Sequence, residues 1–389
     1  MKPPILQRSI PDDGVLNILG RLPVKSVIRF RCVSKSWDSS ITTPYFISTH
    51  LNHNNNNNNN NKGSHDNGYV IHMPSHPSFW WSPNNRPVCT VAFDCTFDRI
   101  SEVKIPFDFY SKPAQLVGSC NGLLCLTDFG SVNVNVIYLW NPCIRKFKKL
   151  PRTCLGKLEN VTLGFAYHSE NNDYKVVRIS STPPSTKALK VYTLSSDSWR
   201  RVGVELTTDV TFGYGKFILP VPLVCGALHW LARIREDGRS ELIMAFDVDS
   251  ERFSKLALPD CLIKANNCER FLASFKGKLT FITFGYNEQP GFPSQYSVWV
   301  MKEYGVVDSW NKLCVVSFQR IACFFGFTEY GSLLVFYCNE LVEGPELKFV
   351  LVYTEILREK KDPDIQHPSY VATFMESLIL LDGANVASY

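Results

Sequence analysis

Four short segments share a glycine followed by alternating apolar residues, and they recur along most of the 389-residue chain. They read SCNGLLCL, VCGALHWL, FKGKLTFI and EYGSLLVF, and their glycines are Gly122, Gly226, Gly277 and Gly331. The glycines lie 104, 51 and 54 residues apart, and Asp173-Tyr174 in NNDYKVVRIS stands midway in the long first interval. A unit of about 50 residues cannot bury its apolar faces alone, so such units must stack against one another.

Each of these glycine-containing segments, here called glycine steps, is followed by a strand-like run, a polar turn and an aromatic residue. These aromatic residues are Phe147, Trp199, Phe253 and Trp310. Two hairpins per unit are the signature of a kelch-type propeller blade, in which glycines and aromatics pack neighbouring blades together. Residues 91–106 resemble the outer hairpin of a further blade, and YVATFMESLILL is expected to help close the ring. We count five clear units and one partial unit, in an all-β, propeller-like domain over residues 69–381.

Residues 10–47 carry helical periodicity instead. Asp12 can cap a first helix, and Pro23 ends that helix and opens the second. The second helix has two apolar stripes, which are Val24, Val27 and Ile28, and Phe30, Val33 and Trp37. Three helices this short rarely form a stable unit by themselves. We therefore expect them to dock on the rest of the chain, or another protein to cover one of the stripes.

The run of eight asparagines at residues 54–61 follows these helices. Such a polar run cannot form a packed core. We predict a flexible, Asn-rich linker over residues 49–68.

Motifs that would carry chemistry are weak. Residues 118–122 fit G-x-C-x-G, but a nucleophile elbow needs a following helix, and a strand-like run follows here. Asp247, Asp249 and Glu251 lack the other ligands of a calcium loop. The 13 cysteines include no C-x-x-C pair, which favours reduced, buried thiols. We expect no metal, no cofactor and no catalysis by this chain alone.

The charge pattern and the N-terminal sequence indicate which classes of partner and which cellular location to expect. Five basic residues, Arg21, Lys25, Arg29, Arg31 and Lys35, lie within 15 residues, but the apolar stripe between them does not suit a DNA-reading helix. No apolar run approaches the roughly 20 residues that span a bilayer, and the N-terminus lacks a signal-peptide apolar region. We expect no nucleic-acid partner, no membrane association, and a location in the cytosol, the nucleus or both.

The helical region resembles the F-box. The stretch IPDDGVLNILGRLPVKSVIRFRCVSKSWDSSITTPYF follows its order of apolar helix, Leu-Pro step and apolar-basic helix ending in Cys/Ser-Lys-x-Trp, and departs from it at Ile10, Gly14 and Gly20. The resemblance implies a small three-helix F-box at residues 8–48, bound by a Skp-type adaptor that links the chain to a cullin. The adaptor-binding residues that it implies are Ile10, Pro11, Leu16, Ile18, Leu19, Leu22, Pro23, Val27, Arg29, Cys32, Val33 and Trp37.

The remaining sequence resembles the plant F-box-associated domain of the kelch-like type, and residues 382–389 are predicted as a C-terminal tail. Segments that carry this resemblance are GSCNGLLCL, LWNP, DYKVVRI, VYTLSSDSWR, GALHWL and FDVDSERF. It implies a non-catalytic substrate receptor of a Skp–cullin–F-box ubiquitin ligase, which holds a protein target near the transferred ubiquitin. Two alternatives stay open: a non-ligase scaffold with a vestigial F-box, and a kelch-type enzyme.

The resemblance does not identify the target. It includes the S-locus F-box proteins, whose targets are pollen-rejection ribonucleases. We expect a target to dock on the loops between the second and third strands of the blades, because these loops vary and binding residues gather on loops of rigid scaffolds. The residues predicted for this surface are Arg235, Glu236, Phe292 and Glu343.

Overall fold

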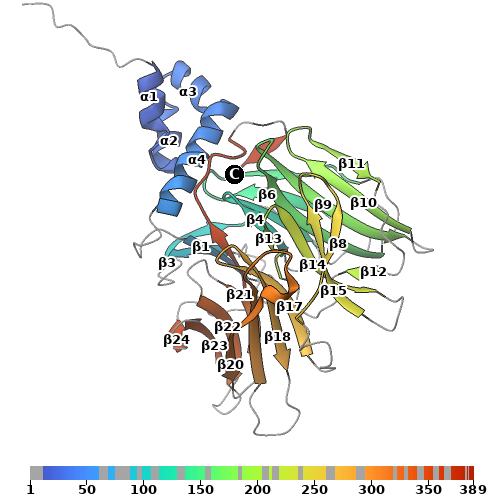
Figure 1. Ribbon diagram of the computed structural model, residues 1–389. Helices are drawn as coiled ribbons and strands as arrows, with labels where there is room; N and C mark the ends of the chain where they lie inside the picture. Colours follow the sequence, from blue (N-terminus) through green and yellow to red (C-terminus); the bar gives the residue numbers. More distant parts are fainter. Residues whose placement is uncertain are drawn as a thin grey trace, which may run out of the picture.

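The computed structural model shows a helical N-terminal body beside a ring of antiparallel sheets (Figure 1). The residues that it describes are 12–60, 69–74, 88–93, 99–106, 114–128, 136–153, 159–182, 186–203, 210–212, 219–234, 240–259, 268–285, 294–318, 322–327, 332–339, 346–353, 359–362, 369–381, 383 and 385–389. No helix in this described part is long and apolar enough to cross a membrane.

The helical body consists of four α-helices in the described residues: α1 (Asp12–Leu19), α2 (Val24–Phe30), α3 (Lys35–Ile41) and α4 (Pro44–Asn60). The side chain of Ser34 accepts a hydrogen bond from the Trp37 amide (3.1 Å) and caps α3. The hydroxyl of Thr43 accepts from the Phe46 amide (3.2 Å) and caps α4 in the same way.

The predicted linker at residues 49–68 is wrong for its first part, because α4 continues through the asparagines to Asn60. Phe46, His50 and Leu51 are buried in the first half of α4 and fix it against the rest of the protein. Adding a residue to an anchored helix is far easier than starting one, so low-propensity residues can continue it. Asn54 also donates a hydrogen bond to the Glu376 carbonyl (3.3 Å).

Six sheets, called blades 1 to 6 here, are seen in the described residues. Blade 1 consists of β25 (Ser369–Phe374), β1 (Tyr69–Pro74), β2 (Val88–Phe93) and β3 (Arg99–Lys104). Blade 2 consists of β4 (Ala114–Cys120), β5 (Leu123–Asp128), β6 (Ile137–Asn141), β7 (Lys146–Lys149) and β26 (Val386–Ser388). Blade 3 consists of β8 (Glu159–His168), β9 (Asp173–Thr182), β10 (Thr186–Thr193) and β11 (Ser198–Val202).

The other three sheets follow in chain order. Blade 4 consists of β12 (Val210–Phe212), β13 (Leu223–Val224), β14 (Ala227–Ile234), β15 (Ser240–Asp247) and β16 (Phe253–Leu256). Blade 5 consists of β17 (Cys268–Phe275), β18 (Lys278–Gly285), β19 (Ser294–Met301) and β20 (Trp310–Phe318). Blade 6 consists of β21 (Ala322–Phe327), β22 (Ser332–Asn339), β23 (Glu346–Tyr353) and β24 (Glu359–Asp362).

The sheets form a closed ring. One strand of each sheet contacts a strand of the next, in the order β25, β4, β8, β14, β17, β21 and again β25. The C-terminal strand β25 completes blade 1 by pairing with β1, as YVATFMESLILL predicts, and β26 extends blade 2 by pairing with β7. The fold class predicted from the sequence, a helical F-box followed by a β-propeller, is confirmed. The described F-box region has four helices where three were predicted, and residues predicted as a tail contribute a strand.

The predicted glycine steps are tight hairpin turns between neighbouring strands. At the first of them, Asn121 and Gly122 both adopt positive φ (50° and 77°), as in a type I′ turn. Gly226 and Gly277 adopt the same conformation (φ 75° and 72°), and each follows a positive-φ residue. Gly331 lies outside the described residues.

Aromatic residues join blades 2 and 3, blades 3 and 4, and blades 4 and 5 in the described part of the chain. The indole N–H of Trp199 donates to the Pro151 carbonyl (2.8 Å), and that of Trp310 donates to the Ala257 carbonyl (3.1 Å). Both acceptors lie in the connection that leaves the preceding blade. Trp230 in blade 4 likewise donates to the Leu163 carbonyl in blade 3 (3.2 Å).

Replacing Gly164 with Ala is expected to lower the free energy of unfolding by about 1–3 kcal/mol, because a methyl group overpacks the contact between blades 3 and 4. An added Cβ would lie 2.6 Å from the Trp230 ring and 2.8 Å from Leu228. Urea unfolding measures the loss. Gly203→Ala is the matched control, since nothing lies within 4 Å of its added Cβ. Equal stability of the two variants would contradict the tight contact.

Mild acid is expected to destabilise the propeller through His229. Burial lowers the pKa of this imidazole to about 4, and its ring lies 2.8 Å from the Tyr304 hydroxyl in the next blade. The unfolded chain binds the proton more tightly, so stability is complete above about pH 6.5 and falls towards pH 4. The contribution lost between pH 7 and 4.5 is about 2–3 kcal/mol. His229→Gln should show a smaller difference in urea unfolding between these two pH values; an unchanged difference would contradict this role.

Candidate functional site

The apolar residues of the helical body divide into an inner and an outer group. The inner group forms one buried cluster with the C-terminal segment, and its members are Leu19, Val24, Val27, Ile41, Phe46, Leu378 and Leu381. Cys143 and Ile144, from the β6–β7 turn of blade 2, pack against the same cluster. The helices therefore dock on the rest of the chain, which is one of the two outcomes expected from the sequence.

The C-terminal segment at residues 375–381 joins the helices to the propeller. The buried amide of Asn141, at the end of β6, donates to the carbonyl oxygens of Ser377 and Ile379, each at 2.9 Å. The side-chain oxygen of Asn141 accepts from the Cys143 amide (3.0 Å). Gly122 approaches the same segment so closely that a Cβ would lie 2.2 Å from the Met375 carbonyl.

His50 connects α4 to the loop between α1 and α2. Its Nε2 lies 2.9 Å from the Leu22 carbonyl, and the residue is fully buried. Burial lowers the pKa of this imidazole, so a neutral ring donates to that carbonyl. The contact holds the Leu-Pro step at residues 22–23 in a fixed position relative to the docked helix.

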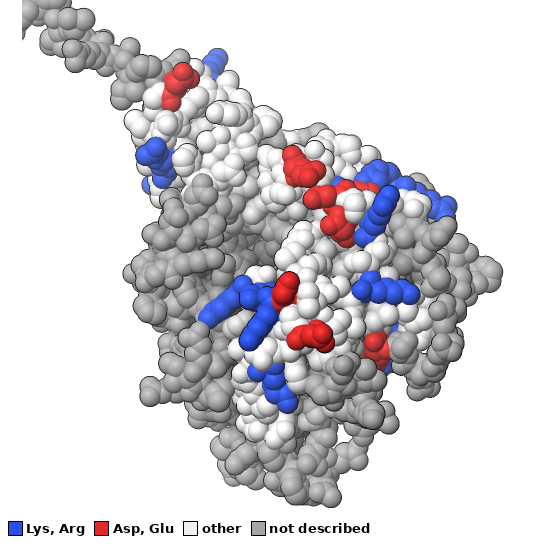
Figure 2. Space-filling model, in the orientation of Figure 1, with Lys and Arg blue, Asp and Glu red and all other residues white. Residues whose placement is uncertain are grey.

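The outer group leaves large apolar side chains uncovered. Ile18, Val33 and Tyr45 are 52%, 60% and 78% exposed. Phe30 is 37% exposed, and its ring is tilted by 58° against that of Trp37, with ring centroids 5.8 Å apart. Figure 1 shows α1 and α3 on the far side of the helical body from the sheets. The face of this body that is visible in Figure 2 is largely uncharged, with charged side chains at its edges. Four large exposed apolar side chains on one small unit make it the candidate interaction surface of the helical body.

The predicted adaptor-binding residues differ in how far the structure buries them. Leu19 and Val27 are wrong as contact residues, because the helices and the C-terminal segment bury both of them. Those that are exposed are Ile18, Pro23, Arg29, Cys32 and Val33, and those partly buried are Leu16, Leu22 and Trp37. Ile10 and Pro11 lie outside the described residues. Sequence reasoning missed Tyr45, whose only signal is an aromatic residue directly after the Pro44 that begins α4.

The four predicted target-binding residues all lie outside the described residues. Arg235 and Glu236 connect β14 to β15, Phe292 connects β18 to β19, and Glu343 connects β22 to β23. In an antiparallel blade, this connection leaves from the end opposite to the turn between the third and fourth strands. The helices dock on such a third-to-fourth turn, at residues 142–145, so the described ends of β14, β18 and β22 that precede these connections lie toward the opposite face of the ring.

The acidic residues of the weak calcium motif have other hydrogen-bond partners. Asp247 accepts from the amide and hydroxyl of Ser250, both at 2.7 Å, and Glu251 accepts from Lys175 (3.0 Å). Ligand atoms of His168, Glu170 and Asp249 lie within 4.8 Å of one another, but Nε2 of His168 is already 2.7 Å from Asp249. This group is better described as a contact between the buried His168 and the exposed Asp249 than as a prepared metal site.

The G-x-C-x-G segment is a hairpin. Cys120 ends β4 and the strand β5 follows the turn, so no helix presents the thiol. Burial raises the pKa of Cys120 to about 12, which keeps it protonated and unreactive at neutral pH.

Comparison with known families agrees with both parts of this architecture. The F-box domain family matches residues 8–49, and the family described as F-box associated beta propeller domain matches residues 85–380. The chain is an F-box protein of the F-box-associated β-propeller family. The Arabidopsis thaliana F-box protein At3g07870 is 28% identical over 78% of this chain and 72% of its own length.

Two further Arabidopsis thaliana relatives of this F-box protein align over a similar share of the chain. F-box/kelch-repeat protein At3g23880 is 28% identical over 78% of this chain and 79% of its own length. F-box protein CPR1 is 27% identical over 79% of this chain and 73% of its own length. The F-box assignment implies an adaptor of the Skp type as the general class of partner.

Proposed function

We propose that this F-box protein is the substrate receptor of a Skp–cullin–F-box ubiquitin ligase in the cytosol, the nucleus or both. The observation that carries the proposal is the uncovered apolar surface of Ile18, Phe30, Val33 and Tyr45, hereafter the outer F-box face. It belongs to a helical body whose other face is already fixed to the propeller. An adaptor bound there would hold the propeller at a fixed orientation relative to the cullin.

The proposed mechanism needs no covalent step by this chain. A rigid receptor raises the effective concentration of a bound protein near the ubiquitin-carrying enzyme, and proximity alone can supply much of the rate. Rigidity is provided by α4, by the C-terminal segment and by the hydrogen bonds of Asn141. The connections that contain Arg235, Glu236, Phe292 and Glu343 are the proposed target-docking surface.

Affinity capture from cells treated with a proteasome inhibitor tests the receptor role. The wild-type protein should enrich adaptor, cullin and a set of ubiquitinated proteins. Replacing the four loop residues together with Ala should keep adaptor and cullin but lose the ubiquitinated proteins. A pollen-rejection ribonuclease is one target that this capture would identify.

Two results would contradict the proposal. Unchanged target capture by the loop variant would move the docking surface elsewhere. Capture of partners without any adaptor or cullin would favour the alternative, a non-ligase scaffold with a vestigial F-box.

A further inference from the structure

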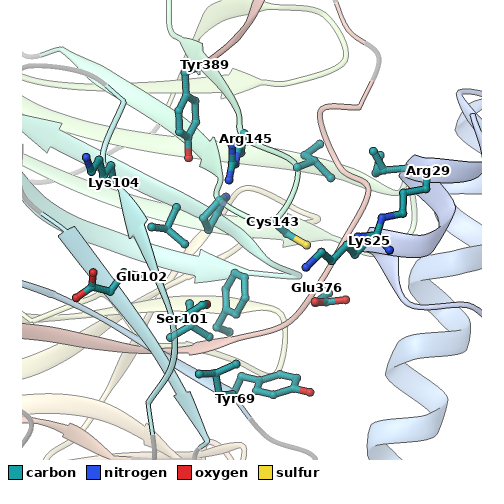
Figure 3. Close-up of a pocket in the computed structure, with 17 residues that line it drawn as sticks. Lys25, Arg29, Tyr69, Ser101, Glu102, Lys104, Cys143, Arg145, Glu376 and Tyr389 are labelled. Carbon is teal, nitrogen blue, oxygen red and sulfur yellow. The ribbon is translucent and has the colours of Figure 1, made fainter. Parts of the chain in front are cut away.

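A hollow of about 930 Å³ lies between α2 of the F-box and blades 1 and 2 of the propeller (Figure 3). Lys25 and Arg29 reach it from α2, Lys104 from β3, and Arg145 from the β6–β7 turn. The C-terminal segment contributes Glu376 to its wall. Its volume falls within the roughly 300–1,000 Å³ of small-molecule sites.

Positive charge dominates this hollow. Four cationic side chains, those of Lys25, Arg29, Lys104 and Arg145, line it together with the carboxylates of Glu102 and Glu376. In the described part of the chain, no ion pair joins any of the four cations to a carboxylate. Four cations in one concave site attract an anionic ligand, and a concave, low-dielectric wall strengthens that attraction.

The propeller repeat supplies an internal comparison for Arg145. It occupies the last position of the β6–β7 turn with φ 53°, and the equivalent positions of blades 3 and 4 are Asp197 (φ 48°) and Glu251 (φ 56°). Those two acids support the fold, because Asp197 pairs with Lys148 (2.9 Å) and Glu251 with Lys175 (3.0 Å). Blade 2 thus has the same turn geometry with an exposed arginine, which the turn itself does not require.

The remaining wall is apolar and aromatic. Its apolar residues are Ile28, Val91, Ile100, Val103, Ile144 and Phe374. Tyr69 and Tyr389 add two phenols, and burial raises the pKa of both, so they stay protonated as hydrogen-bond donors at neutral pH. An apolar wall with a few convergent charged groups suits an organic ligand that has both a body and charged substituents.

We propose that this hollow binds a small organic phosphate, whose phosphate groups contact Arg145, Lys104, Lys25 and Arg29 and whose body packs against the apolar wall. A guanidinium can hold two phosphate oxygens at once, and lysines add point charges. Because the cations come from both the F-box and the propeller, the bound ligand bridges the two parts. This inference is independent of the proposed ligase role.

Isothermal titration of the full chain with inorganic tripolyphosphate tests the phosphate-binding half of the site. Saturable binding is expected for the wild type, with affinity about tenfold weaker in Lys104→Gln/Arg145→Gln, since two charge-assisted contacts are lost. Both residues are exposed, so melting temperatures should stay equal. These substitutions leave α2 and the outer F-box face unchanged.

Lys255→Gln/Lys302→Gln is the matched control, because it removes the same charge from exposed lysines of blades 4 and 5. Wild-type affinity in this control, with the loss confined to Lys104→Gln/Arg145→Gln, supports the site. Absence of saturable binding by the wild type, or an equal loss in both double variants, overturns it.

Discussion

Replacing Ile18 and Val33 together with Asp is expected to abolish binding of a Skp-type adaptor. Both side chains are more than half exposed in the free protein, so the new carboxylates stay in water and the fold should be unaffected. In the complex the same positions would be covered, and each unpaired buried charge costs several kcal/mol. A total penalty above about 4 kcal/mol weakens affinity more than 1,000-fold.

The adaptor affinity of this variant is measured by isothermal titration, with the melting temperature as the check on folding. Val306→Asp/Leu313→Asp is the matched control, since both residues are apolar, 40% exposed and located in blade 5. It should bind the adaptor like the wild type. Wild-type affinity in Ile18→Asp/Val33→Asp would show that the outer F-box face does not contact the adaptor.

Replacing Asn141 with Ala is expected to lower the free energy of unfolding by about 3–5 kcal/mol. The change removes the donors to the buried Ser377 and Ile379 carbonyls and the acceptor of the part-buried Cys143 amide. Each buried group left unpaired costs about 1–3 kcal/mol. Urea unfolding measures the loss, and Asn311→Ala, at an exposed strand position, should cost less than about 1 kcal/mol.

The same substitution should also loosen the F-box. Residues 375–381 carry Leu378 and Leu381 into the core of the helical body, so weakening their attachment weakens the docking of the helices. Hydrogen exchange should therefore accelerate in α1 and α2 as well as in the C-terminal segment. Faster exchange restricted to blade 2, or stability equal to that of Asn311→Ala, would contradict this coupling.

The propeller was predictable because its signals are local and repeated. A glycine such as Gly122 or Gly277 is needed where the turn requires positive φ, and the repeat shows this at a regular interval. The aromatic residues recur at about the same interval, and two of them meet the neighbouring blade in the same way. Trp199 and Trp310 accordingly make equivalent hydrogen bonds to the preceding connection.

Helical periodicity could not predict which apolar residues of the F-box are buried and which are exposed. Both apolar stripes look alike in sequence, and which one is buried depends on Leu378 and Leu381, more than 300 residues away. The continuation of α4 through the asparagines depends equally on tertiary packing of Phe46 and Leu51. The cationic hollow has the same origin, because it joins residues of α2, β3 and the β6–β7 turn.

Size-exclusion chromatography with light scattering, on the wild-type chain mixed with a Skp-type adaptor and the adaptor-binding domain of a cullin, tests the receptor role most directly. The uncovered outer F-box face predicts a single peak whose mass corresponds to one copy of each protein. The Ile18→Asp/Val33→Asp variant should elute as a free monomer beside an adaptor–cullin peak. Elution of the wild-type chain by itself, with the adaptor and cullin in a separate peak, would contradict the account.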